Sequence, residues 1–430
     1  MKYRQFIFED YNFNQDSKVL TLSYRLDDSL AFSETYKFDF DFTSYDPAVL
    51  DQALQGLFIM AGISYYKTYL PPEIVINKGR LDKKDADFFA KTYQKGLSEF
   101  FYTNNLDPNT SIHFPDNLDS LQPANTNLRD GQLIAIGGGK DSLVSAELLR
   151  DQPRVATWSV GHRSLLEPLV KQIGLNHLWV DRTWDKQLLE LNQKDAYNGH
   201  IPISAIFACV GVVVAILSGY RDVVVSNESS ASESSLTYHR VPINHQYSKS
   251  LEFEKDFQNY QAQHFVSGPR YFSFLRPLSE LRISDIFAKI AFEKYKDVFS
   301  SCNRAFTHDS SNLYWCGVCP KCAFTFLALT PFISKDKLES LWGGKNLLLD
   351  PALEPTYKQL LGIEGDKPLE CVGEIKEARA AMNLAKKQYP ELEKYRYDIP
   401  GDYDYAALGP HSMPPETFDV LNSAISRFSK

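Results

Sequence analysis

The chain has few cysteines, with six in 430 residues. Small secreted folds held by disulfide bonds carry many more for their length, so a disulfide scaffold is excluded. The chain also lacks a basic excess, because 46 Lys and Arg stand against 54 Asp and Glu, giving a formal charge of −8. Surfaces that bind nucleic acid usually have such an excess, and we therefore expect no nucleic-acid partner.

Long apolar segments are scarce as well. The N-terminal stretch reaches Glu9 and Asp10 without an apolar run, so we expect no signal peptide and a cytoplasmic protein. One uncharged run, residues 201–220, is long enough to cross a membrane. Because Pro202 and Gly211 interrupt it and an apolar strand follows, a helix buried against a parallel sheet is the favoured interpretation, and no membrane partner is expected.

The most informative segment is a glycine loop. Apolar residues Leu133–Ile136 lead into three glycines, and an amphipathic segment then runs to Leu149. This pattern predicts a strand, a tight turn and the first turn of a helix, whose free N–H groups and dipole favour an anion. A phosphate chain is the best-suited anion, and the predicted phosphate-binding residues are Gly137, Gly138, Gly139, Lys140, Asp141 and Ser142.

The spacing of this loop is too short for the GxxxxGK[ST] nucleotide loop. It resembles the SGGxDS loop of the PP-loop ATP pyrophosphatases, with Gly137 in the usual position of a serine. Those enzymes split ATP into AMP and pyrophosphate, usually by adenylating a substrate. The resemblance implies that ATP and Mg²⁺ bind here, with Asp141 coordinating the metal or ordering the phosphates.

The rest of the chain suggests four parts. Residues 1–120 alternate like antiparallel strands and then turn helical, which predicts an N-terminal α+β domain. Residues 121–300 alternate strands and helices, which predicts an α/β domain with a doubly wound parallel sheet of PP-loop type and a ligand at the carboxyl ends of its strands. A four-cysteine module at 301–323 and a mainly helical region at 324–430 follow.

The four-cysteine module carries thiols at metal-ligand spacing. Its cysteines are Cys302, Cys316, Cys319 and Cys322. Thiolates spaced in this way can surround one tetrahedral cation, and structural Zn²⁺ is the favoured ligand. An iron–sulfur cluster and buried free thiols remain the alternatives.

A polar stretch at 229–268 offers titratable groups. Low complexity at its start is typical of a flexible surface loop or of a lid that orders on binding. His245 lies four residues before Lys249, so on a helix the two would share a face. We consider these two as catalytic residues, with a solvated face as the alternative. Glu228 and Glu233, just past a strand end, are candidates for metal binding.

Seven motifs in order carry a closer resemblance. They are Gly62–Lys67, Gly137–Ser142, Ser226–Glu233, Asn244–Lys249, Phe299–Arg304, Cys319–Cys322 and Glu370–Glu374. Over about residues 1–385 the chain is similar to the UDP-N-acetyl-α-D-muramoyl-L-alanyl-L-glutamate epimerase family of bacterial peptidoglycan synthesis. On pattern alone, the first motif is better explained as a packed turn than as a substrate loop.

The resemblance implies an ATP-dependent epimerase. Its substrate would be UDP-N-acetyl-α-D-muramoyl-L-alanyl-L-glutamate (UDP-MurNAc-L-Ala-L-Glu), whose terminal L-Glu becomes D-Glu as AMP and diphosphate are released. The family acts beside a muramyl ligase that adds L-Glu. Asp141, Glu228, His245 and Lys249 are then the expected catalytic residues. The alternatives are another adenylating enzyme, similar to the 7-cyano-7-deazaguanine synthases, and a non-catalytic zinc-containing scaffold.

Overall fold

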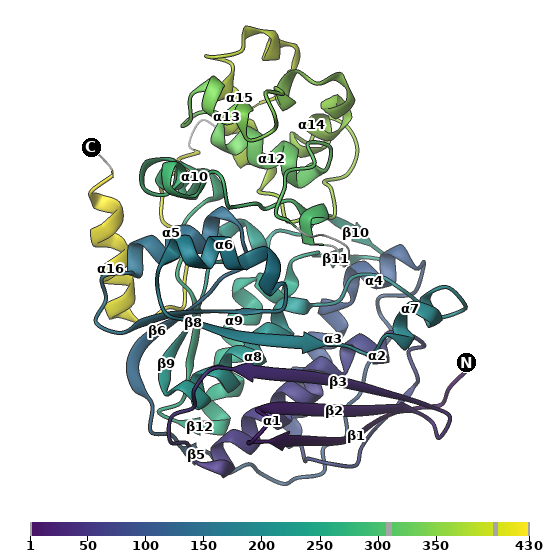
Figure 1. The fold of residues 1–430 in the computed structure, drawn as a ribbon. Helices are drawn as coiled ribbons and strands as arrows, with labels where there is room; N and C mark the ends of the chain where they lie inside the picture. Colours follow the sequence, from purple (N-terminus) through teal and green to yellow (C-terminus); the bar gives the residue numbers. More distant parts are fainter. Residues whose placement is uncertain (1, 307–311, 399–402, 429–430) are drawn as a thin grey trace.

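One large mixed sheet organises the protein. The computed structural model describes residues 2–306, 312–398 and 403–428. Within these residues nine strands form the sheet, in the spatial order β13 (Arg270–Ser273), β9 (Tyr220–Val225), β6 (Arg129–Ala135), β7 (Val155–Val160), β8 (His177–Thr183), β3 (Leu30–Asp39), β2 (Val19–Leu26), β1 (Gln5–Asn14) and β4 (Glu73–Ile76) (Figure 1). The strands from β13 to β8 are parallel to one another, as the βα alternation predicted. The expected α/β class with a large parallel portion is confirmed.

The N-terminal strands extend this same sheet. Residues 35–39 of β3 pair antiparallel with residues 179–183 of β8, and β2 and β1 follow as an antiparallel meander. Every second side chain of β2 is buried, which is the half-exposed pattern that the sequence indicated. The boundary expected near residue 120 therefore does not coincide with an edge of the sheet, and the four-part division stays a prediction.

Helices cover both faces of the sheet. In β6, Leu133 belongs to one apolar core and its neighbour Ile134 to the other, because successive strand side chains point to opposite faces. The core on the first face includes side chains from α1 (Pro47–Ala61), α3 (Lys83–Gly96), α8 (Ile203–Ser218) and α9 (Leu251–His264). The core on the second includes side chains from α5 (Lys140–Leu149), α6 (Arg163–Ile173), α10 (Glu280–Ile290) and α16 (Pro415–Ser426). A parallel sheet covered on both faces places its ligand at a strand end and not on a face.

The uncharged run forms α8, whose side chains are buried almost throughout. The helix packs against α1 and leads directly into β9. It is the buried helix that the sequence favoured. In the described part of the chain, no helix combines the length and the apolar character that a membrane crossing requires.

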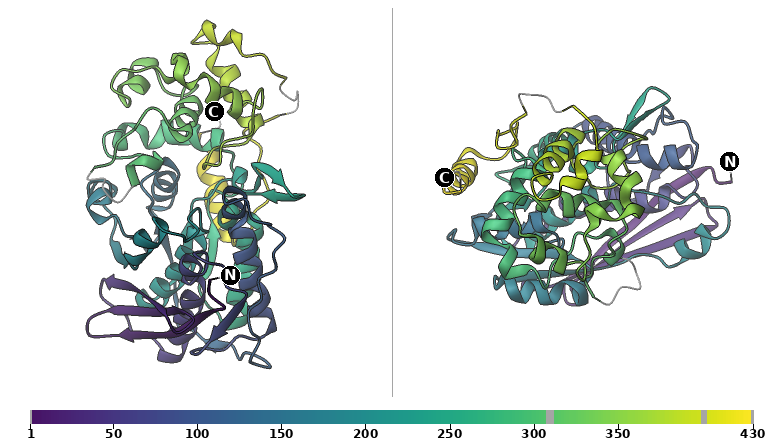
Figure 2. Two further views of the ribbon diagram at one scale, coloured as in Figure 1. Left: turned by 90° about the vertical axis from the view of Figure 1, so that its right-hand side faces the viewer. Right: turned by 90° about the horizontal axis from the view of Figure 1, so that it is seen from above.

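The C-terminal region is mainly helical, as predicted. Besides α16, its α-helices are α12 (Pro320–Leu329), α13 (Lys335–Ser340), α14 (Glu354–Leu360) and α15 (Ile375–Ala385). They stand above the sheet and contact it through α10, which packs on α12 and α15 (Figures 1 and 2). The residues between the sheet and these helices consequently lie over the strand ends.

The polar stretch at 229–268 is more ordered than expected. It forms a hairpin of β10 (Leu236–Tyr238) and β11 (Val241–Ile243), a 3-10 turn η2 (Tyr247–Lys249), and α9. The expectation of a flexible loop is wrong for α9, because Phe253, Phe257 and Tyr260 form a buried aromatic stripe at helical spacing. His245 precedes η2, so His245 and Lys249 do not share a helix.

The motif at Gly62–Lys67 is a packed turn. Helix α2 (Ile63–Tyr66) is buried, and the Tyr65 hydroxyl donates to Glu34 at 2.8 Å. Arg182, at the end of β8, donates to the same buried carboxylate at 2.7 Å. These polar groups bond to one another inside the N-terminal half, which agrees with the structural interpretation of the motif.

Candidate active site

A cavity of about 530 Å³ lies at the carboxyl ends of the central parallel strands. Residues that follow β6, β7 and β9 line it, among them Gly137, His162 and Asn227. The polar ends of these three strands therefore meet at one edge of the sheet, whereas Arg182 at the end of β8 bonds to Glu34 and does not line the cavity. The remaining walls come from the start of α8, from Lys249, and from Ser301, Lys321 and Cys371 of the C-terminal region. The volume is within the range of small-molecule sites.

The three glycines of the loop have different surroundings. Around Gly137 a Cβ atom would meet nothing within 4 Å, so this residue faces open space. Gly138 has a φ of +88°, and a Cβ there would lie 2.7 Å from the ring of Phe306. A Cβ on Gly139 would lie 2.7 Å from the Ser301 hydroxyl. The loop therefore needs glycine at its second and third positions, for conformation and for close packing respectively.

The residues that begin α5 divide between the cavity and the interior. Asp141 and Ser142 line the cavity, whereas the Lys140 side chain is buried and forms ion pairs with Asp141 and Glu280. The Ser142 hydroxyl donates to the Gly139 carbonyl at 3.0 Å. Among the described residues, no side chain caps the start of α5, so its first N–H groups keep their capacity to bind an anion.

Three carboxylates gather beneath the loop. Oxygen atoms of Asp141, Glu228 and Glu280 lie within 4.8 Å of one another. Burial raises the pKa of Asp141, Lys140 opposes this rise, and Glu280 adds to it. A hard divalent cation such as Mg²⁺ prefers oxygen ligands and would relieve the crowded negative charge. The donor set thus fits Mg²⁺. Glu280 was not among the predicted residues, because it lies 140 positions from Lys140 in the sequence.

Glu233 lies outside this cluster. Its carboxylate accepts from the buried Lys367 ammonium at 2.5 Å. It therefore serves an ion pair between the polar stretch and the C-terminal region in this structure. Of the two glutamates after β9, Glu228 alone joins the acidic cluster.

A second polar group centres on Cys371. The Lys249 ammonium donates to the Cys371 sulfur at 3.1 Å, and both residues line the cavity. His245 is not among the lining residues; its Nδ1 bonds to the Glu99 carboxylate, and its ring lies close enough to Cys371 to affect the thiol. Burial raises the pKa of Cys371, but Lys249 and His245 outweigh it and bring the value to about 6. Burial lowers the pKa of His245, whereas Cys371 and Glu99 raise it, with a net value of about 9.

Cys371 was absent from the predicted site residues. The motif Glu370–Glu374 pointed to its segment, yet a single cysteine 122 positions from Lys249 carries no local signal of function. Lys321 was overlooked for a similar reason, since it lies between two cysteines of the metal-ligand pattern. Both residues enter the site only through the folding of the C-terminal region over the sheet.

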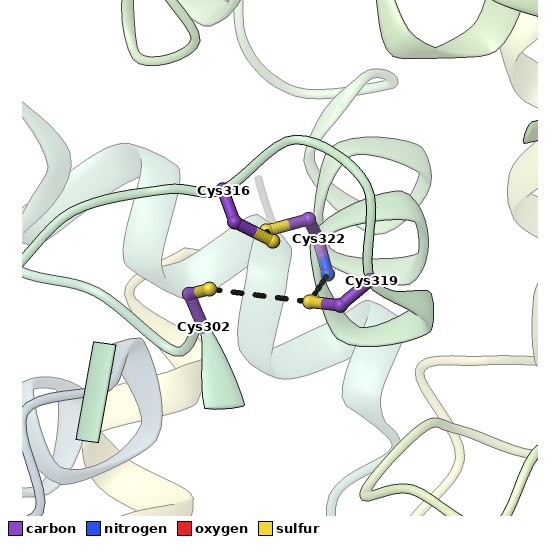
Figure 3. Close-up of side chains that lie close together, drawn as sticks. All are labelled: Cys302, Cys316, Cys319 and Cys322. Atoms are coloured by element: carbon purple, nitrogen blue, oxygen red, sulfur yellow. Dashed lines mark hydrogen bonds between the residues drawn. The ribbon is translucent and has the colours of Figure 1, made fainter. Parts of the chain in front are cut away.

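The four cysteines of the predicted metal site come together (Figure 3). The sulfur of Cys302 lies 4.0 Å from that of Cys319, and the sulfur of Cys316 lies 3.8 Å from that of Cys322. Four thiolates at a Zn–S distance of about 2.3 Å would be separated by about 3.8 Å in a tetrahedron. The arrangement is compatible with a structural zinc ion.

This four-cysteine cluster supports the glycine loop. The Ser300 N–H donates to the Gly138 carbonyl at 3.1 Å, and Ser301 packs against Gly139. Both serines directly precede Cys302. On the other side, the Glu370 carboxylate accepts from Asn303 and from the Lys321 N–H, at 3.0 and 3.1 Å. The cluster thus connects the glycine loop to the segment that carries Cys371.

Comparison with known proteins identifies the family. A family model described as the MurL N-terminal domain matches residues 1–274, and one described as the MurL C-terminal domain matches residues 298–395. The chain belongs to the MurL family. A protein of Xanthomonas oryzae pv. oryzae named UDP-N-acetyl-alpha-D-muramoyl-L-alanyl-L-glutamate epimerase is 38% identical, and the match covers 94% of each chain. The family resemblance seen in the motifs is confirmed.

Two further relatives have the same name as the protein of Xanthomonas oryzae pv. oryzae. The protein of Salinispora tropica is 40% identical over 79% of this chain and 74% of its own, and that of Micromonospora sp. is 39% identical over 86% and 85%. No solved structure matches the chain. The cavity draws on both MurL domains, because the glycine loop and Lys249 lie in the N-terminal match and Lys321 and Cys371 in the C-terminal match.

Proposed function

We propose that this protein is an ATP-consuming epimerase of peptidoglycan precursor synthesis. It inverts the terminal L-Glu of UDP-MurNAc-L-Ala-L-Glu to D-Glu and releases AMP and pyrophosphate. The names of three relatives at 38–40% identity support the substrate and the inversion. The use of ATP is supported by one cavity in which a PP-loop-like glycine turn meets titratable residues. A muramyl ligase that adds L-Glu would supply the substrate.

Adenylation gives the ATP a chemical purpose. The Cα proton of glutamate is hard to remove while the neighbouring carboxylate is negative. In the proposed reaction a carboxylate oxygen attacks the α-phosphorus, its bond to the bridging oxygen breaks, and pyrophosphate leaves. The resulting mixed anhydride is uncharged at the acyl group, so Cα becomes more acidic and the enolate can be stabilised by nearby donors. A base then removes the proton, an acid returns one to the opposite face, and water releases AMP.

The residues that line the cavity, and two buried carboxylates beside Asp141, suit these steps. The open face of Gly137 and the free N–H groups of α5 would hold the departing pyrophosphate. Asp141, Glu228 and Glu280 would hold Mg²⁺, which when bound neutralises phosphate charge. Apolar side chains such as Trp158 and Phe207 line another wall and suit the base of a nucleotide. Lys249 provides a cation near the reacting carboxylate.

We propose a structural role for the cysteine cluster. A Zn²⁺ ion held by its four thiolates would fix Ser300 and Ser301 against the loop. Such a site is closed, since all four positions of the tetrahedron are protein ligands. Its contribution would be to the stability of the loop, while the acidic cluster serves the phosphates.

The test uses ATP, Mg²⁺ and UDP-MurNAc-L-Ala-L-Glu. We expect pyrophosphate to appear with D-Glu in the product after hydrolysis and chiral separation. Asp141→Asn should abolish both signals, and Asp151→Asn should retain them, because Asp151 is an exposed aspartate just beyond the same helix. Pyrophosphate without inversion would contradict the epimerase and favour another adenylating enzyme. Inversion without ATP would contradict the adenylation step, and the absence of both would favour a non-catalytic scaffold.

A further inference from the structure

The groups first considered for proton transfer act on a single sulfur atom. Lys249 donates to Cys371 at 3.1 Å, and His245 affects the same thiol from a different segment. An inversion needs a base and an acid on opposite faces of the reacting carbon. Two residues that converge on one atom cannot approach that carbon from opposite sides. They are better placed to hold a charge on the atom they share.

Cys371 itself meets the geometric requirements of a proton carrier. It lines the cavity together with Asp141 and Gly137, whereas His245 does not. Its segment is fixed, because the neighbouring Glu370 accepts hydrogen bonds from Asn303 and Lys321. Lys249 is fixed as well, since its carbonyl accepts from the buried Arg276 guanidinium. The sulfur is thus held beside the site where the glutamate carboxylate would be activated.

We propose that the Cys371 thiolate is one of the two groups that exchange a proton with glutamate Cα, and that Lys249 and the His245–Glu99 pair position and charge it. The proposal rests on the proposed function. On one face of the adenylated glutamate, the C–H bond breaks and an S–H bond forms. The electron pair of the C–H bond moves into the enolate, whose charge resides on the acyl oxygen. A second group, across the cavity from Cys371, delivers a proton to the other face. In the reverse direction the thiol returns its proton to Cα.

The electrostatic surroundings support this role. The thiol pKa of about 6 leaves Cys371 ionised near neutral pH, because the Lys249 and His245 cations outweigh the effect of burial. Cys371 in turn raises the pKa of Lys249, so the ammonium stays protonated and does not compete as the base. A base whose pKa lies near the working pH combines ionisation with useful basicity. His245 and Lys249 are then positioning residues.

The test compares Cys371→Ala with Cys209→Ala in ²H₂O. Cys209 is a buried core cysteine of α8 outside the cavity, and it serves as the matched control. Each enzyme receives ATP, Mg²⁺ and either the L-Glu or the D-Glu diastereomer. Three quantities are measured: ATP–pyrophosphate exchange, deuterium incorporation at Cα, and inversion.

We expect Cys371→Ala to retain ATP–pyrophosphate exchange within about threefold of the control and to lose inversion by a factor of about 10²–10⁴. Deuterium incorporation should vanish for one diastereomer and persist for the other, because the base on the opposite face remains. Cys371→Ser should behave in the same way, since a hydroxyl is a far weaker acid than a thiol. Retained pyrophosphate exchange also shows that the variants fold.

Three results would overturn the assignment. They are inversion by Cys371→Ala at the rate of the control, equal loss of pyrophosphate exchange and inversion, and a covalent glutamyl adduct on Cys371 in the quenched wild-type protein. The adduct would mean that the sulfur attacks the acyl group and not the proton. Failure of the proposed function would look different, because the wild-type protein itself would then lack ATP-dependent inversion.

Discussion

The second glycine of the loop is the position where the smallest substitution should have the largest effect. Gly138→Ala and Gly137→Ala add the same methyl group to adjacent residues. At Gly138 the backbone has a φ of +88° and the new Cβ would lie 2.7 Å from Phe306 Cζ and 3.2 Å from Leu166 Cδ2. At Gly137 the new Cβ would meet no atom of the described residues within 4 Å, apart from those of its chain neighbours. The pair therefore separates the backbone requirement from the mere addition of volume.

The magnitudes follow from these surroundings. A left-handed backbone costs an L-residue roughly 1–2 kcal/mol, and an extra methyl in a packed site costs roughly 1–3 kcal/mol. Replacing glycine also lowers the conformational entropy of the unfolded chain, which raises the free energy of unfolding by about 0.4–1 kcal/mol. Gly138→Ala should therefore lower the free energy of unfolding by about 1–4.6 kcal/mol. Gly137→Ala should be neutral or slightly stabilising, because only the effect on the unfolded chain applies.

Two measurements check this prediction. Urea denaturation gives the free energy of unfolding of both variants and of the wild-type protein. ATP–pyrophosphate exchange reports on the loop, and it should fall more than tenfold in Gly138→Ala. If the two alanine variants are equally stable and equally active, the loop conformation described here is wrong. Gly137→Ser, which adds the hydroxyl usual in PP-loop enzymes, should fold normally, since its side chain enters open space.

Three other predictions concern the supports of the cavity. Treatment with a chelator that removes metal from the cysteine cluster should speed amide hydrogen exchange at residues 137–142, because Ser300 and Ser301 hold the loop there. Unchanged exchange would mean that the cluster does not stabilise the loop. Arg276→Met should lower the free energy of unfolding, measured by urea denaturation, by about 3–5 kcal/mol, since it leaves the Glu254 carboxylate buried without its cation. The double variant Arg276→Met and Glu254→Leu should recover part of this free energy, and no recovery would refute the explanation. Iodoacetamide alkylation of Cys371, followed by peptide mass spectrometry, should rise as the pH increases through about 6, because the thiolate is the reactive form. The pKa of the thiol is lowered by Lys249, His245 and Lys321, and Glu99 is bonded to His245. In Lys249→Met the pH at which alkylation rises should increase by at least one unit, whereas Lys255→Met, at an exposed lysine, should leave this pH unchanged. Equal profiles for the wild-type protein and both variants would show that Lys249 does not control the thiol pKa.

Local sequence patterns predicted much of the fold. The strand and glycine turn at 133–139 and the run that became α8 were recognisable because consecutive residues determine them. The thiol spacing at 316–322 was informative for the same reason. Helix α9 was overlooked because polar residues separate its aromatic stripe, and the serine-rich start of the stretch suggested a loop. The pairing of β3 with β8 depends on contacts between distant segments, which a single sequence does not encode in any local pattern.

The site was harder to predict than the fold because its groups come from distant segments of the sequence. Lys140 meets Glu280 through the packing of α10 on α5, and Lys249 meets Cys371 only once the C-terminal region lies over the strand ends. Patterns along the chain pointed to the glycine loop and to the four cysteines. They could not indicate which isolated carboxylate or thiol would complete each cluster.

The position of the cysteine cluster explains why both chemical functions belong in one cavity. Ser300 and Ser301 hold the loop that would bind the phosphates, and Asn303 and Lys321 hold Glu370, the neighbour of Cys371. In the proposed reaction, adenylation and proton transfer act on atoms of the same glutamate, so the two sets of groups would have to keep a fixed separation. A small displacement of either set would greatly reduce the rate, because catalysis depends on alignment of the reacting atoms. A closed metal site at the four cysteines would support both segments and meet this requirement, whereas two independent loops would each add their own motion.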